Sequence, residues 1–106
     1  MASWPESVEV LTPAAGAVLR RDEVGGVFEL AWSGPEPGTY WVEYRAGPAG
    51  AVTGAFPAGR PAVRFGPFPE GFWNDVAAYS PFQVRVLDAE ARRRSSWREI
   101  RAAPAS

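Results

Sequence analysis

The sequence predicts an all-β fold, a sandwich of seven antiparallel strands. Short runs rich in β-branched and aromatic residues recur along the 106 residues, separated by clusters drawn from 11 Gly and 11 Pro, which is typical of small sandwiches. Several runs alternate apolar and polar residues, so each strand has one apolar face. There is no regular alternation of strands with long amphipathic helices, which argues against a parallel α/β sheet.

The expected strands are 8–12 with a short second piece at 17–20, 27–33, 40–45, 51–56, 62–65, 82–87 and 96–102. Turns rich in Gly and Pro separate them, for example at 34–38. The apolar positions of the clearest strands form the expected core: Phe28, Leu30, Trp32, Tyr40, Val42, Tyr44, Phe82, Val84 and Val86.

The length predicts one domain, residues 1–106, with its strands within 8–102. Residues 103–106 form a short tail, which we expect a neighbouring subunit to hold more readily than the domain's own core. The start of the chain lacks the basic and apolar regions of a signal peptide, and no apolar run could cross a bilayer. We therefore expect synthesis in the cytosol and no contact with a membrane.

One segment departs from the strand pattern. Phe72, Val76 and Tyr79 are spaced as on one face of a helix, which predicts a short helical turn near residues 70–79. Its aromatic residues could close one end of the sandwich. Alternatively Phe72, Trp73 and Tyr79 form an exposed contact surface, because loops on rigid scaffolds often carry function.

Composition excludes most catalytic chemistry. The chain has no Cys, His or Lys, so thiolate, imidazole and Schiff-base mechanisms and Cys/His zinc sites are all impossible. Glu70 and Asp75 could form an acid and base pair, but two carboxylates in one loop are weak evidence. No spacing of acidic residues suggests a calcium loop. We expect no enzymatic activity, no metal and no cofactor.

The order of motifs resembles a fibronectin type III domain over residues 8–102. Trp32, the Tyr-x-Val-x-Tyr pattern from Tyr40 and the Phe-x-Val-x-Val pattern from Phe82 occupy the corresponding places. Phe82 stands where that family has a tyrosine whose hydroxyl forms a corner hydrogen bond, so a looser immunoglobulin-like topology stays open. The resemblance implies a sandwich that acts by binding.

The resemblance also implies a polar outer face. If Tyr40 and Val42 point inward, then Trp41, Glu43 and Arg45 point outward beside Gln83, Arg85 and Leu87, and Trp97, Glu99 and Arg101 share that face. Arginine side chains would then stack on tryptophan rings. Such a ladder could be purely structural, or it could be a recognition surface, since both residue types are enriched at interfaces.

Positive charge gathers late in the chain. Residues 82–106 carry net +3, against −4 for residues 1–81. Arg92, Arg93 and Arg94 are adjacent in an expected hairpin loop, where they could meet an acidic patch on another protein or simply be solvated. We do not expect nucleic acid as a partner, because the whole chain is net −1.

These observations predict a non-enzymatic interaction module, a small subunit of a large assembly such as a phage virion. Its partners would be other proteins or copies of itself. The expected contact residues are Trp41, Arg45, Trp73, Arg85, Arg92, Arg93, Arg94, Trp97 and Arg101. The alternative is a carbohydrate-binding module in which exposed tryptophans stack on sugar rings.

Overall fold

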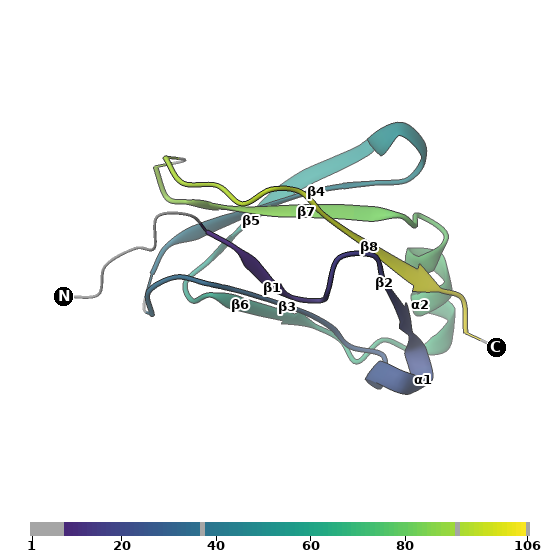
Figure 1. Cartoon of the computed structure of the whole chain (residues 1–106). Coiled ribbons are helices and arrows are strands. Elements are labelled where there is room, and N and C mark those ends of the chain that lie inside the picture. The colour runs from purple at the N-terminus through teal and green to yellow at the C-terminus, as the bar shows by residue number, and fades with distance from the viewer. Residues whose placement is uncertain (1–7, 37, 91, 106) are drawn as a thin grey trace.

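Two β-sheets pack face to face in the computed structural model, which describes residues 8–36, 38–90 and 92–105 (Figure 1). Residues 1–7, on which the expectation of no signal peptide rests, and Ser106 of the expected tail lie outside these ranges. A β-sandwich is therefore confirmed in outline, since strand is the main secondary structure of the described residues and forms two sheets.

The smaller sheet is antiparallel and has the order β1-β3-β6. Its strands are β1 (Val10–Thr12), β3 (Phe28–Trp32) and β6 (Ala62–Phe65). The larger sheet has the order β2-β8-β7-β4-β5. Its strands are β2 (Ala17–Arg20), β4 (Tyr40–Ala46), β5 (Val52–Ala58), β7 (Phe82–Asp88) and β8 (Arg98–Ala103).

The described residues contain eight strands, so the expectation of seven antiparallel strands was wrong in two respects. The first expected strand is divided, and β2 pairs with β8 in parallel. Pro13 has no backbone N–H with which to extend the pairing of β1. Gly16, at φ 75°, then donates its amide to the carbonyl of Glu99 at 2.9 Å. The chain thereby changes sheet between β1 and β2, and this change closes one side of the sandwich.

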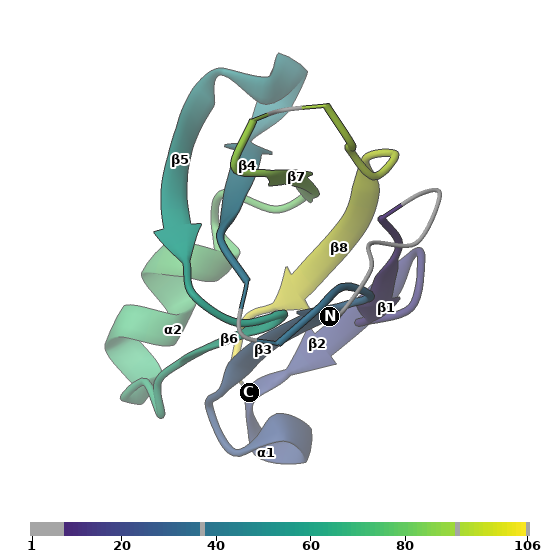
Figure 2. The same ribbon diagram turned by 90° about the vertical axis from the view of Figure 1, so that its left-hand side faces the viewer.

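The opposite side is formed by β5 and β6, which the short loop 59–61 connects (Figure 2). The expected helical segment is confirmed as α2 (Glu70–Ala77), which packs against β8. Two further elements were not expected, the four-residue helix α1 (Arg21–Val24) and the 3-10 turn η1 (Pro48–Gly50). Helix α1 ends at Gly25, whose φ of 66° is accessible to glycine at little cost.

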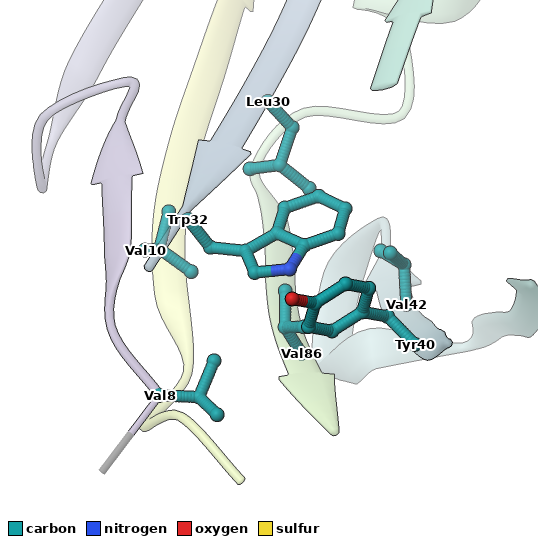
Figure 3. Packing of buried hydrophobic residues seen from close by; sticks show 7 residues of the cluster. All are labelled: Val8, Val10, Leu30, Trp32, Tyr40, Val42 and Val86. Carbon is teal, nitrogen blue, oxygen red and sulfur yellow. The ribbon is translucent and has the colours of Figure 1, made fainter. Parts of the chain in front are cut away.

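The main buried cluster lies between the two sheets (Figure 3). Trp32 and Tyr40 form its centre, with 5.3 Å between ring centroids and 75° between ring planes. The Tyr40 hydroxyl donates to the carbonyl of Pro35 at 2.5 Å, which ties the preceding turn to β4. The cluster is completed by Val8, Val10, Leu30, Val42 and Val86.

Expected core residues fall into two groups. Leu30, Trp32, Tyr40, Val42 and Val86 are buried, as the alternation predicts. The other four are only partly buried, namely Phe28, Tyr44, Phe82 and Val84. All four line a cavity that the sandwich leaves between its sheets.

Candidate functional site

The outer face of the larger sheet carries the expected arginines. In the β4–β7 register Glu43 lies opposite Arg85, and Arg45 lies opposite Gln83. Arg85 Nε donates to Glu43 Oε1 at 2.5 Å, and Arg45 Nε donates to the side-chain oxygen of Gln83. Each guanidinium is thus held by the residue across from it.

Trp97 joins these two arginines. It lies just before β8, and its ring centroid is 4.2 Å from Arg45 Cζ and 4.6 Å from Arg85 Cζ. The expected stacking of arginine on tryptophan is confirmed at this ring. Because each guanidinium also has a polar partner, the side chains are fixed before any ligand arrives.

An open hollow of about 470 Å³ lies beside Trp97 and extends toward the edge strand β5. Its walls are formed by Glu43, Tyr44, Arg45, Thr53, Gly54, Ala55, Arg85 and Trp97. Trp41 lies on the same face, exposed and paired with Leu87 on β7 and Pro57 on β5. Arg101 is exposed farther along β8, 3.9 Å from Glu99. The structure therefore brings four of the expected contact residues, Trp41, Arg45, Arg85 and Trp97, to one surface, with Arg101 at its end.

Trp73 does not belong to this surface, and the expectation that it makes an exposed contact was wrong. Its side chain lies on the buried face of α2 and is fully buried. Its indole N–H donates to the carbonyl of Ala103 at 2.7 Å. Helical spacing could not show this, because Phe72 and Trp73 are adjacent and only the packing of α2 on β8 decides which one turns inward. Phe72 and Tyr79 remain exposed.

The same helix holds the C-terminal segment, contrary to the expectation that a neighbouring subunit would hold it. The amide of Ala105 donates to Asn74 Oδ1 at 2.7 Å. Ala105 also packs against the second buried cluster, which contains Trp73, Ala77 and Ala102. Up to Ala105, then, the tail is tied to the domain itself.

The arginine loop is organised by one buried carboxylate. Asp88 Oδ1 accepts the amides of Arg92 and Arg93 at 2.7 and 3.2 Å, and Asp88 Oδ2 lies 3.5 Å from the Arg93 guanidinium. Arg92 is exposed and pairs with Glu90 at 3.1 Å. Arg94 is exposed at the isolated bridge to Leu87. The loop and Trp97 belong to the same connection between β7 and β8. Leu87, the bridge partner of Arg94, also pairs with Trp41, so the loop adjoins the end of the outer face that carries Trp41.

Comparison of the chain with protein-family models, with curated proteins and with solved structures finds no match. The described residues contain no cluster of three or more acidic, His or Cys side chains that could hold a metal ion. Glu70 and Asp75 are both exposed on α2. Among the described helices, none is long and apolar enough to span a membrane.

A second site was not recognised in the sequence. A half-open cavity of about 390 Å³ lies between the sheets, and its lining includes the exposed residues Phe65 and Phe72. Its lining consists of Pro13, Leu19, Phe28, Glu29, Leu30, Val42, Tyr44, Phe56, Phe65, Phe68, Phe72, Val76, Phe82, Val84 and Ile100. The signal in the sequence is the concentration of phenylalanines between residues 56 and 72, which hold Phe56, Phe65, Phe68 and Phe72 of the six in the chain.

Proposed function

We propose that this chain is a non-enzymatic interaction module that assembles with copies of itself or with a protein partner into a larger structure. One observation carries the proposal. Each of the four edge strands of the described sandwich bears a large apolar side chain that is at least 42% exposed: Leu11 on β1, Val18 on β2, Val52 on β5 and Phe65 on β6.

Edge strands present unpaired backbone groups, and monomeric proteins usually protect such edges with charge, proline or short length. Three of the edges, β1, β2 and β6, are short, at three or four residues. The fourth, β5, runs over seven residues and has Pro57 as its protection near one end. Its Val52 lies unprotected at the other end. Apolar edges of this kind are suited to pairing with another chain, which would cover them.

The outer face with Trp97 supports the same function. Its arginines and tryptophans are the residue types that dominate binding energy at protein interfaces, and they are already held in place by Glu43 and Gln83. A sugar would need a free, flat ring. Trp73 is buried and two guanidiniums stack on Trp97, so of Trp41, Trp73 and Trp97 only Trp41 has an exposed ring.

The mass of the particle that contains the chain in its source cell tests the proposal. A virion or a comparable assembly would give a mass far above the 11.5 kDa of one chain. A free monomer in the cell, and also at every concentration in sedimentation velocity, would overturn it.

Variants then locate the contact. Val18→Lys and Val52→Lys each place a charge on an edge and should reduce association. Ala15→Lys adds the same charge at an exposed turn outside the strands and should leave association unchanged. Equal loss from all three variants would indicate a general effect of charge and would contradict pairing through the edges.

A further inference from the structure

We infer that the cavity between the sheets is a binding site for the hydrocarbon chain of a small single-chain amphiphile. This inference rests on the interior of the sandwich and does not depend on the assembly proposed above. The cavity volume of about 390 Å³ falls at the lower end of the range of small-molecule sites, roughly 300 to 1,000 Å³.

The lining comes from both sheets and from α2. Leu30 of β3, Val84 of β7 and Ile100 of β8 form inner walls, and Val76 adds a wall from the helix. Seven of the 15 lining residues are aromatic. Protein interiors are normally packed as closely as organic crystals. The side chains of these elements instead leave a space between them that the protein itself does not fill.

Polar groups are few in this lining. Of the 15 lining side chains only those of Glu29 and Tyr44 carry polar atoms. Glu29 lies in β3 between the inward-facing residues Phe28 and Leu30, opposite Arg64 of β6, so its carboxylate belongs to the other face of that sheet. A sugar or a nucleotide would lose its hydrogen bonds to water here without replacing them. The ligand portion inside is therefore hydrocarbon.

The same argument excludes a peptide segment as the occupant. A peptide would carry its own N–H and C=O groups into the cavity, where the lining offers almost no partners. An alkyl or acyl chain has no such groups. Its polar head would stay in water at the opening between Phe65 and Phe72, which are both exposed.

The test uses a series of dissolved, neutral 1-alkanols and methyl NMR of the full chain. Signals from Leu30, Val42, Val84 and Ile100, which line the cavity, should shift with saturation, and those of the exposed Leu11 and Val18 should not. Each added methylene should tighten binding about fourfold, equivalent to about 0.8 kcal/mol, until the cavity is filled. Affinity that does not depend on chain length, or shifts confined to surface residues, would overturn the inference.

Two variants test the opening. Phe72 lines the cavity and Tyr79 does not, yet they are 50% and 51% exposed, so the two substitutions are matched in burial. Phe72→Asp should weaken alkanol binding by roughly tenfold or more, because the charge must lose water as the chain enters. Tyr79→Asp should leave binding unchanged. Equal effects of both variants would contradict a ligand at this opening.

A last experiment distinguishes binding of a dissolved amphiphile from binding to a membrane and from dimerisation of the chain. Phosphatidylcholine vesicles should not capture the protein. Binding to vesicles without saturable alkanol binding would replace the inference with a membrane surface. A dimer that protects the same methyl groups and excludes alkanols would replace it with a contact between copies.

Discussion

The indole of Trp73 lies flat against the phenyl ring of Phe28, with 4.5 Å between ring centroids and 14° between ring planes. Trp73 belongs to α2 and Phe28 to β3, so this stack ties the helix to the smaller sheet. The hydrogen bond from Trp73 to Ala103 ties the same helix to β8 of the larger sheet. One side chain therefore joins both sheets at this end of the sandwich.

Replacement of Trp73 should be severely destabilising. Trp73→Ala removes a fully buried side chain and should lower the free energy of unfolding by about 3 to 5 kcal/mol. Chemical denaturation measures this change. Trp41→Ala removes the same residue type from an exposed position and should change stability by about 0.5 kcal/mol or less. Similar losses from both variants would contradict the distinct burial of the two tryptophans.

Stability should fall at alkaline pH because of Tyr40. Burial, with a smaller contribution from the negative charge of Glu36, raises the pKa of Tyr40 above its usual value of 10.0. The unfolded chain therefore loses this proton first. The contribution of Tyr40 to stability is complete below about pH 10 and is lost as pH rises toward the folded pKa.

Denaturation midpoints measured across this range test the expectation. The chain has no Lys or Cys, whose ordinary pKa values would overlap this range. Tyr40→Phe should remove much of the alkaline decrease. It should also cost about 0.5 to 1.5 kcal/mol at neutral pH, because the hydrogen bond to Pro35 is lost. An unchanged alkaline decrease in this variant would contradict the role of Tyr40.

Gly54 makes room for the ring of Tyr44, which lies opposite it across β4 and β5. A Cβ atom at position 54 would stand 2.5 Å from Tyr44 Cζ. Gly54→Ala should therefore force the ring toward the cavity and cost about 1 to 3 kcal/mol. Gly59→Ala, where nothing lies within 4 Å of the added atom, should be neutral or slightly stabilising. Thermal unfolding of the two variants compares them directly.

The stack of Arg85 on Trp97 should contribute a small, measurable coupling. A double-mutant cycle with Arg85→Ala and Trp97→Ala should give about 0.5 to 1 kcal/mol. Arg92 is exposed and pairs with Glu90, whereas the guanidiniums over the Trp97 ring are those of Arg45 and Arg85. The same cycle with Arg92→Ala should therefore give no coupling. Equal values in the two cycles would show that the geometry at Trp97 has no energetic effect.

Alternation along each strand was enough to predict much of the larger sheet. In the segment from Tyr40 to Arg45 every second residue is apolar, and this period places Glu43 and Arg45 outward whichever strands lie alongside. The pairing of Glu43 with Arg85 required only that β4 and β7 be neighbours in the expected register. Alternation could therefore predict which side chains of this strand point outward, whereas the neighbouring strand and the stacking of arginine on tryptophan were expected from the resemblance to a fibronectin type III domain.

Three features depended on contacts between distant segments. The parallel pairing of β2 with β8 joins residues more than 80 positions apart, and no local pattern encodes such a partner. Trp73 and Phe72 are neighbours in α2, and only the position of β8 decides that Trp73 is the buried one. The cavity is a third case. Alternation correctly predicts that Phe28, Tyr44 and Val84 point inward, but it does not show that they line a cavity instead of packing against one another.

The sequence by itself determined where the strands lie and which face of each is apolar, because these properties follow from the period of two in an extended chain. Only the tertiary structure decided how far the two sheets approach one another. Their separation depends on the helix, the turns and the side chains of both layers together. Where those elements hold the sheets apart, inward residues line a cavity instead of closing a core.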